Sequence, residues 1–463
     1  MIDEALVAQL RQAVGAGHVR TDPATLSAYG VDALGRGAMP DAVAWPGNTG
    51  EVSAVARACH AARTPLVPRG AGSGYTGGAV PTRGGVVITL ERMNRILEID
   101  ADNLLAVVEP HVVTGELQAA VERQGLFYPP DPASLARSVI GGNVAECAGG
   151  PRAFKYGVTK HYVLGLEAVL PTGDVIRTGG RTVKNVVGYD LTQLLVGSEG
   201  TLAVITKAVL RLIPKPAARA TARATFRSVG EAVAAVLLLL RARVVPATLE
   251  LVDAESLDAV AAHLGEAALA PLGTGALLLI EVDGSPEQVR GDEARVADAC
   301  RRAGCTEFRL ATDEGERQAL WRARRELSPA LRTIAPLKFN HDVVVPRSRV
   351  ADLFDLVEHI RRESGLRVPC FGHVGDGNIH VNLMADDTPE ARLRVAAAER
   401  RLFEGVVALD GSISGEHGIG FAKAPFIGLE LTPETIAVMK RVKAAFDPSG
   451  ILNPGKIFPP DVH

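Results

Sequence analysis

The sequence predicts an α+β protein that is built from more than one domain. Its 463 residues exceed the size at which a single hydrophobic core usually stops growing. Between residues 42 and 67 the pattern is strand, helix, strand, which is typical of a βαβ unit. Beyond Ile213-Pro-Lys-Pro216, helices and strands alternate with strands about 30 residues apart, which indicates a ferredoxin-like or similar split-βαβ domain with an antiparallel sheet.

Composition excludes several classes of protein. The net charge is −3 and the charged residues are mixed along the chain, so nothing indicates a surface for nucleic acid. The five cysteines include no Cys-x-x-Cys pair, which argues against an iron–sulfur ligand set and a disulfide framework. The longest apolar run, 232–240, is shorter than the roughly 18 residues of a membrane span. We expect a soluble, cytoplasmic protein that could dock peripherally on the inner face of a membrane.

The first part of the chain leads into a glycine-rich loop. After an amphipathic helix over 3–15 and an irregular lead-in, strand 42–45, helix 51–63 and strand 66–67 end in Pro68-Arg69-Gly-Ala-Gly-Ser73-Gly. A Rossmann fingerprint needs a helix directly after its glycines, whereas here a strand over 85–90 follows. Any phosphate would therefore be held by backbone N–H groups, with Arg69 and Ser73 as helpers. A tight glycine turn is the alternative.

A second glycine-rich loop follows further along the same domain. It covers 138–150, after a strand over 104–109, a helix over 115–124 and the stiff corner Tyr128-Pro-Pro-Asp131-Pro. Two such loops in one domain suit a long, two-ended ligand better than a mononucleotide. Strands are expected over 164–170, 175–177 and 200–212, and 184–190 is either a solvated basic loop or a ligand contact.

The second half contains a helix with three arginines and then a hairpin with two histidines. The three arginines could simply form a solvated face of the helix, as most helical arginines do. Alternatively, one of them could bind the carboxylate of a substrate through a bidentate guanidinium contact. In Cys370-Phe-Gly-His373-Val-Gly-Asp-Gly-Asn-Ile-His380-Val-Asn382, an Asp-Gly turn predicts that His373 faces His380 across the hairpin. The two imidazoles could then share one metal ion, with Asn382 on the same face. Two hydrogen-bonded strand histidines are the alternative.

A third histidine occurs beside a carboxylate in another glycine-rich loop. The stretch Gly411-Ser-Ile-Ser-Gly-Glu416-His417-Gly-Ile-Gly420 follows a helix expected over 389–408. Glu416 would supply a metal ligand, and His417 would remain as a base. The hairpin and this loop together favour a metal site over two packed histidines.

Six motifs occur in order along the chain, and together they resemble those of one family. They are Pro68-Arg-Gly-Ala-Gly-Ser-Gly, Ile140-Gly-Gly-Asn-Val-Ala, Gly197-Ser-Glu-Gly-Thr, Gly372-His-Val-Gly-Asp-Gly-Asn-Ile-His, Gly415-Glu-His-Gly-Ile-Gly and Ile451-Leu-Asn-Pro-Gly-Lys. The sequence resembles the FAD-binding oxidoreductases of the vanillyl-alcohol-oxidase (PCMH-type) superfamily. Within it, the resemblance is to the glycolate oxidase catalytic subunit, D-lactate dehydrogenase and D-2-hydroxyglutarate dehydrogenase group.

The resemblance implies a domain plan. After the lead-in over 1–37, it places a two-subdomain FAD-binding domain at 38–216 and a substrate or cap domain at 217–410. The C-terminal segment 411–463, which carries Glu416 and His417, would return to the FAD-binding domain.

The resemblance also implies site residues. His373, His380 and Glu416 would bind a divalent metal, Zn or Mn, His417 would be the catalytic base, and Arg324 and Asn382 would hold the substrate. FAD would be bound without a covalent link by Arg69, Gly70, Ala71, Gly72, Ser73, Gly74, Pro130, Asp131, Ser138, Gly141, Gly142, Asn143, Ala145, Gly149, Glu199, Gly200, Ile205 and Asn453.

The implied activity is oxidation of a small (R)-2-hydroxy acid, such as D-lactate or glycolate, to the 2-oxo acid. Two positions depart from relatives: Cys147 stands where Asn is common, and Phe339-Asn340-His341 stands where some relatives have a lysine that binds a distal carboxylate. The second departure argues against a dicarboxylate substrate.

Three other functions are weighed against this activity. They are an accessory, non-catalytic flavin subunit of a glycolate oxidase complex, a flavin-dependent alkyl transferase of the same superfamily, and a metal hydrolase without flavin. The chain has no nicotinamide fingerprint. We therefore expect a quinone, a cytochrome, an electron-transfer flavoprotein or an iron–sulfur subunit to accept the electrons. The chain could also form a homodimer.

Overall fold

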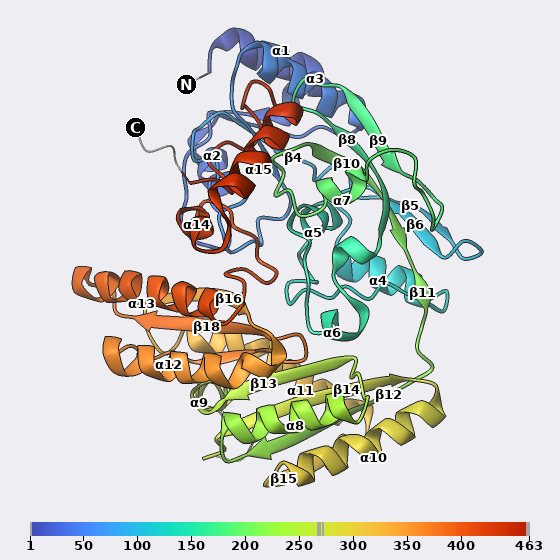
Figure 1. Ribbon diagram of the computed structural model, residues 1–463. Helices are drawn as coiled ribbons and strands as arrows, with labels where there is room; N and C mark the ends of the chain where they lie inside the picture. The colour runs from blue at the N-terminus through green and yellow to red at the C-terminus, as the bar shows by residue number, and fades with distance from the viewer. Residues whose placement is uncertain (1, 266–269, 271–272, 460–463) are drawn as a thin grey trace. The chain divides into compact units, whose positions relative to one another are not determined.

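The computed structural model describes residues 2–265, 270 and 273–459, and the chain divides into two compact units. Unit 1 comprises Met1–Gly149, Val158–Lys215 and Glu416–His463. Unit 2 comprises Gly150–Gly157 and Pro216–Gly415. Figure 1 colours the chain from its N-terminus to its C-terminus and labels the elements of both units.

The first sheet of unit 1 forms around a parallel βαβ unit. In the described chain its strand order is β1-β2-β4-β3, with β2, β4 and β3 parallel and β1 antiparallel to β2. Helix α3, Thr49–Ala61, begins where the Asn48 side chain accepts a hydrogen bond from the Glu51 N–H at 3.0 Å. Its apolar side is buried, which fixes the helix against the unit's core. The strands are β1 Val19–Arg20, β2 Ala42–Ala44, β3 Leu66–Arg69 and β4 Val86–Thr89.

The C-terminal segment joins this sheet. Leu66 N–H donates to the Ile451 carbonyl at 2.8 Å, and Asn453 N–H donates to the Leu66 carbonyl at 2.8 Å. Leu452 thus forms a parallel bridge with Leu66, and Ile451 and Leu452 are buried in the same core as helix α1, Glu4–Val14. Both ends of the described chain therefore contribute to one hydrophobic core.

The second sheet of unit 1 is antiparallel, with the order β5-β6-β10-β8-β9 in the described chain. A separate pair, β7 and β11, forms a short antiparallel ladder. The second glycine-rich stretch, expected to be a loop, contains helix α5, so this expectation was wrong. The bounds are β5 Ile96–Asp100, β6 Leu105–Val108, β7 Leu126–Phe127, β8 Val163–Val169, β9 Val175–Gly179, β10 Val204–Arg211 and β11 Ile213–Pro214, with α2 Pro23–Tyr29, α4 Thr114–Glu122, α5 Ile140–Glu146, α7 Leu191–Leu195, α14 Ile427–Glu430 and α15 Pro433–Phe446.

Unit 2 is built on one antiparallel sheet with the order β15-β12-β14-β13-β17-β18-β16 in its described residues. Helices α8, α10, α12 and α13 contact one another in a layer, and α9 and α11 form a second layer (Figure 1). The bounds are β12 Ala218–Phe226, β13 Thr248–Asp253, β14 Ala276–Gly284, β15 Glu307–Leu310, β16 Leu337–Val344, β17 Cys370–His373 and β18 Asn378–Ala385, with α6 Ala153–Tyr156, α8 Val229–Arg241, α9 Ala254–Leu264, α10 Pro286–Arg302, α11 Glu314–Leu331, α12 Val350–Ser364 and α13 Pro389–Ala408.

The histidine hairpin has a different register from the predicted one. His373 is paired with Asn378, and Phe371 is paired with His380, so the predicted pairing of His373 with His380 is wrong. The turn contains four residues, 374–377, instead of two. Because the register shifts by two residues and the side-chain period of a strand is two, both histidines still lie on the same face of the sheet.

Candidate functional site

A cavity in unit 1 is bounded by separated pieces of the chain. They include the end of β3 with the first glycine-rich stretch, helix α5, and residues 199–205 at the start of β10. Glycine backbone and small apolar side chains form much of the wall. The lining residues are Pro68, Arg69, Gly70, Gly78, Ala79, Leu90, Pro110, His111, Val139, Gly141, Gly142, Ala145, Glu146, Glu199, Gly200, Ala203, Val204 and Ile205.

Two glycines of this wall lie where backbone segments nearly touch. A Cβ atom at Gly70 would be 3.0 Å from Val139 Cγ2, and a Cβ atom at Gly141 would be 2.7 Å from Pro110 Cβ. Larger residues would force these segments apart, so the glycines keep side chains out of the wall. A wall of this kind lets a ligand lie directly against backbone atoms.

The wall includes part of the predicted cofactor set. It contains Arg69, Gly70, Gly141, Gly142, Ala145, Glu199, Gly200 and Ile205, whereas Ala71, Gly72, Ser73, Gly74, Pro130, Asp131, Ser138, Asn143, Gly149 and Asn453 lie outside it. Sequence reasoning missed Leu90 and the pair Pro110 and His111. Leu90 directly follows the buried parallel strand β4, and the carboxyl end of a parallel strand is a common position for ligand contacts, so a signal was present for Leu90. Pro110 and His111 follow Glu109 after the antiparallel strand β6 and carried no such signal.

The Arg69 side chain donates a hydrogen bond to the protein's own backbone. Its Nη1 donates to the Val31 carbonyl at 2.8 Å, and the guanidinium carbon lies 5.4 Å from the centre of the Tyr29 ring. Burial lowers the pKa of Arg69, while the neighbouring Asp32 opposes that shift. These contacts fix the backbone that leads into the first glycine-rich stretch.

Two predicted cofactor asparagines also make internal hydrogen bonds. Asn143 Nδ2 donates to Thr114 Oγ1 at 2.6 Å. Asn453 Nδ2 donates to the carbonyl oxygens of Gly78 and Glu199, at 2.9 and 2.8 Å. Asn453 therefore connects the C-terminal segment to two segments of the cavity wall.

Glu199 holds the loop that carries His417. Its carboxylate accepts hydrogen bonds from the backbone N–H groups of Ile419 at 2.8 Å and Gly420 at 2.6 Å. Burial raises the pKa of Glu199, and these hydrogen bonds oppose the shift. Thr76 Oγ1 donates to the His417 carbonyl at 3.0 Å. The backbone of this loop is thus held within unit 1 at His417 and at the residues that follow it.

In unit 2, polar side chains gather on one face of neighbouring strands. Glu250 is paired with His373 across β13 and β17, and Asn340 is paired with Asn382 across β16 and β18. His373 and His380 are 4% and 7% exposed, and their ring centres are 5.5 Å apart at nearly perpendicular planes. Two buried imidazoles on one face are suited to binding a common ion.

Glu250 links His373 to Arg324 of helix α11. One carboxylate oxygen lies 2.5 Å from His373 Nδ1, and the other accepts from Arg324 Nε at 2.7 Å and lies 2.5 Å from Arg324 Nη2. The Arg324 guanidinium also stacks over the Phe371 ring, with its carbon 4.8 Å from the ring centre. Burial by itself raises the pKa of Glu250, but Arg324 and His373 outweigh it and lower that pKa to about 2.

The amide of Asn382 has a defined orientation. Its Nδ2 donates to the carbonyl oxygens of Pro369 at 3.1 Å and His380 at 3.2 Å. Its Oδ1 therefore faces Asn340, whose Nδ2 donates to it at 2.7 Å. Asn340 Oδ1 is buried and has no hydrogen-bond partner among the described residues, which makes it an acceptor in need of a donor.

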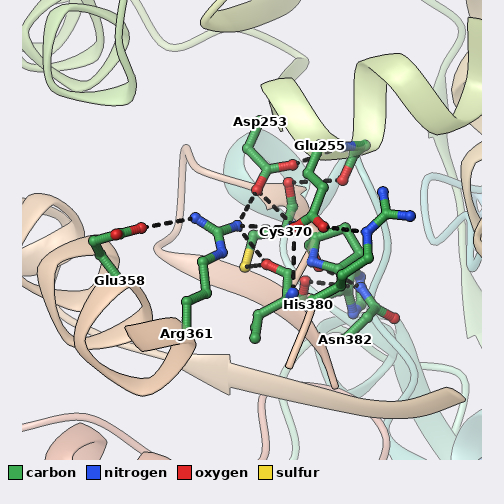
Figure 2. Close-up of polar contacts among 11 residues, drawn as sticks. Asp253, Glu255, Glu358, Arg361, Cys370, His380 and Asn382 are labelled. Atoms are coloured by element: carbon green, nitrogen blue, oxygen red, sulfur yellow. Dashed lines mark hydrogen bonds and ion pairs between the residues drawn. The ribbon is translucent and has the colours of Figure 1, made fainter. Parts of the chain in front are cut away.

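An ion-paired cluster fixes the start of β17. Asp253 accepts hydrogen bonds from the backbone N–H groups of Ser256 at 2.9 Å and Cys370 at 3.0 Å, and from Arg361 Nη2 at 2.7 Å. Figure 2 shows the Arg361 guanidinium between Asp253 and Glu358, beside the Cys370 sulfur. The Cys370 side chain is fully buried in the hydrophobic core, and this burial raises the pKa of its thiol. The cluster anchors β17 three residues before His373.

The fold and the domain matches define the class of protein. The structure resembles a p-cresol methylhydroxylase crystal structure with substrate bound, with a TM-score of 0.83 and 19% identity over 98% of this chain and 96% of that one. The family model of an FAD binding domain matches residues 40–179. The chain therefore has the PCMH-type FAD-binding fold and is an FAD-linked oxidoreductase, as predicted.

Comparison with curated proteins identifies the family. The model of the C-terminal domain of FAD linked oxidases matches residues 215–457, and the chain belongs to this family. It is 43% identical to glycolate oxidase subunit GlcD of Bacillus subtilis, over 100% of this chain and 98% of that protein. It is 35% identical to D-lactate dehydrogenase of Anaerostipes hadrus, over 91% of this chain and 90% of that protein.

In the described part of the chain, every helix is too short or too polar to span a membrane.

Proposed function

We propose that the chain oxidises a small (R)-2-hydroxy acid of the D-lactate or glycolate type to the corresponding 2-oxo acid. The observation that carries the proposal is the shared contact of Arg324 and His373 with the Glu250 carboxylate. A group that can bind a carboxylate and a group that can bind a metal are thereby held next to each other. A 2-hydroxy acid needs this pairing, because its carboxylate and its hydroxyl are on adjacent carbons. The names of the two relatives support the same class of substrate.

The wall of the cavity in unit 1 supports this cavity as the FAD site. The glycines that keep side chains out of its wall leave room for a flat ring system, and the matched FAD binding domain contains most of this wall. We propose that FAD is bound without a covalent link. When bound, FAD supplies the hydride acceptor at N5, and a divalent ion supplies a Lewis acid for the substrate hydroxyl.

Arg324 would bind the substrate carboxylate. Two of its five N–H donors are directed at Glu250, and a guanidinium has further donors in the same plane that match a carboxylate. The contact with Phe371 holds this plane in one orientation. Asn382 would bind the substrate through the remaining acceptor site of its Oδ1. Its own N–H groups are not available, because they already donate to the backbone.

His373, His380 and Glu416 have the ligand types of a zinc or manganese site. The two histidines are buried on one face of the sheet of unit 2. Gly415, the residue before Glu416, donates its N–H to Asp342 Oδ2 at 3.0 Å, and Asp342 is paired with His380 across β16 and β18. The chain path thus ties the residue next to Glu416 to the strand partner of His380, which supports Glu416 as the third ligand.

His417 would remove the proton of the substrate hydroxyl. Glu199 and Thr76 fix the backbone around it, and the Tyr75 ring packs beside it with ring centres 5.3 Å apart. A base whose position is already fixed needs little reorganisation during proton transfer. The electrons would then leave for a quinone, a cytochrome, an electron-transfer flavoprotein or an iron–sulfur subunit, since the sequence lacks a nicotinamide fingerprint.

The test is anaerobic bleaching of the flavin with a panel of glycolate and both enantiomers of lactate and of 2-hydroxyglutarate. We expect D-lactate or glycolate to reduce the flavin, and His417→Ala to slow that reduction about 10²–10⁴-fold while FAD stays bound. If no hydroxy acid in the panel bleaches the wild-type flavin, the proposed activity is wrong. If His417→Ala bleaches as fast as the wild type, His417 is not the base.

A further inference from the structure

Glu250 is a buried carboxylate in a position that the sequence does not mark as functional. It lies in the middle of β13, which is hydrogen-bonded to β14 on one side and to β17 on the other. Its side chain is 0% exposed, so solvent cannot satisfy its two oxygens. Burying a carboxylate is tolerated only when each of its oxygens accepts a hydrogen bond. Here both donors come from residues with proposed roles in binding substrate or metal.

The contact with His373 determines the tautomer of that ring. A carboxylate can only accept hydrogen bonds, so the Nδ1 atom that lies 2.5 Å from Glu250 must carry a proton. In the neutral ring the lone pair is then on Nε2, which is the arrangement that a metal-binding histidine requires. The same contact also fixes the rotation of the ring about its side-chain bonds.

The second oxygen of Glu250 fixes the orientation of the Arg324 guanidinium. It accepts from Nε at 2.7 Å and lies 2.5 Å from Nη2, while the Phe371 ring packs against the guanidinium plane. Rotation of the guanidinium would break contacts with both neighbours. Glu250 is therefore the common support of a candidate metal ligand and a candidate carboxylate-binding group.

We propose that Glu250 is a positioning residue that aligns His373 for metal binding and Arg324 for the substrate carboxylate. This inference rests on the proposed function. Because one side chain supports both groups, its loss should weaken metal binding and substrate binding together. FAD binding should be unaffected, because the cavity assigned to FAD is lined by residues of unit 1 alone.

The test compares Glu250→Gln with Glu281→Gln in the full-length, FAD-loaded protein after treatment with a chelator. Glu281 is a matched control, because it is also buried on this sheet and accepts from Trp321 Nε1 of helix α11 at 3.0 Å and from Thr221 Oγ1 at 2.6 Å. Mn²⁺ alone is titrated, and free Mn²⁺ is measured by electron paramagnetic resonance. We expect Glu250→Gln to weaken Mn²⁺ binding about 10–100-fold and to raise the KM for D-lactate, with the FAD content unchanged.

Several results would overturn the inference. Equal weakening by Glu281→Gln would show that Glu250 acts only by holding helix α11. Mn²⁺ binding that is lost in His373→Gln but unchanged in Glu250→Gln would refute the inference and leave the proposed function intact. Failure of the wild type to bind Mn²⁺ would instead refute the metal site, and the inference with it.

A measurement on the wild type keeps the inference testable if Glu250→Gln does not fold. Nitrogen-15 spectra of histidine-labelled protein, with His373 assigned by its loss in His373→Gln, report which ring nitrogen carries the proton. We expect a protonated Nδ1 in the metal-free protein. A proton on Nε2 together with an unprotonated Nδ1 would contradict the proposed alignment.

Discussion

Replacing Arg361 by Met tests how firmly the Asp253 cluster holds the start of β17. The substitution removes the cation from Asp253, whose side chain is 5% exposed, and leaves a buried carboxylate without its ion-pair partner. Breaking a buried ion pair in this way costs about 3–5 kcal/mol. The Arg361 side chain is itself 25% exposed, so we expect the lower end of that range, about 3 kcal/mol. The lost hydrogen bond from Arg361 to the Val368 carbonyl adds about 1 kcal/mol.

A second substitution separates the charge from the packing. Asn at position 253 keeps the capping oxygen for Ser256 but removes the charge. In the Arg361→Met background, Asp253→Asn should therefore restore about 2 kcal/mol of stability, because no charge is then left buried. If Arg361→Met costs the same with and without Asp253→Asn, the cluster is not stabilised by its ion pair.

The cost of Arg361→Met should depend on pH. Burial raises the pKa of Asp253 and Arg361 opposes that shift, so loss of Arg361 raises this pKa further. Between the unfolded pKa and the raised folded pKa, the folded state binds more protons, and stability falls as pH rises. Arg361→Met should therefore cost more free energy of unfolding at pH 8 than at pH 5. An equal cost at both values would contradict the assigned role of Asp253.

The chain offers a convenient probe for these measurements. It has two tryptophans, Trp45 in unit 1 and Trp321 in unit 2. In a Trp45→Phe background, urea unfolding followed by fluorescence reports on unit 2 through Trp321. This separation matters because a chain with two units need not unfold in one step.

Two further substitutions test the substrate face and the C-terminal loop. Asn340→Lys should raise kcat/KM for (R)-2-hydroxyglutarate relative to D-lactate by about tenfold or more, because a charged hydrogen bond to the distal carboxylate contributes about 1.5–3 kcal/mol; no change in this ratio would remove Asn340 from the substrate site. Gly77→Ala should lower the temperature of flavin release, because Gly77 has a φ of +80° and its Cβ would lie 2.1 Å from Phe421 Cε1, whereas Gly428→Ala meets nothing within 4 Å and serves as the control. Equal behaviour of both glycine variants would contradict this reasoning.

Local signals in the sequence predicted most of unit 2. Helix α13 begins at Pro389 with Thr388 as its cap, and helix α10 begins at Pro286 with Ser285 as its cap. Both helix starts are therefore indicated by a capping residue followed directly by proline. The antiparallel sheet followed from the regular alternation of elements. These features depend on short-range chemistry, which a single sequence contains.

The hairpin register could not be predicted from its turn residues. Asp376-Gly377 favours a two-residue turn, but the Gly377 carbonyl accepts from the Val345 N–H at 3.1 Å and Val374 is fully buried. Contacts with the rest of unit 2 therefore override the local preference and lengthen the turn. Asp-Gly was a valid signal for a turn and a poor guide to which residues form it.

Glu250 was missed for a related reason. Its partner His373 is 123 residues away in the sequence, and a glutamate in an apolar strand gives no local sign of its partner. Helix α5 was missed because its glycines have low helix propensity. There, the N–H groups of Ile140 and Gly141 donate to the carbonyls of Val112 and Pro110, contacts that only the folded chain supplies.

The bridge between Leu66 and Leu452 has a consequence for the order of folding during synthesis. The Asn453 amide reaches the Gly78 carbonyl across 375 residues, and Leu452 is part of the core of unit 1, so this core cannot be completed until residues 451–453 have left the ribosome. All residues of unit 2 have been made by Gly415. We therefore expect unit 2 to fold first, although most of unit 1 is made before it, and a nascent chain stalled before residue 451 to remain protease-sensitive in unit 1 alone.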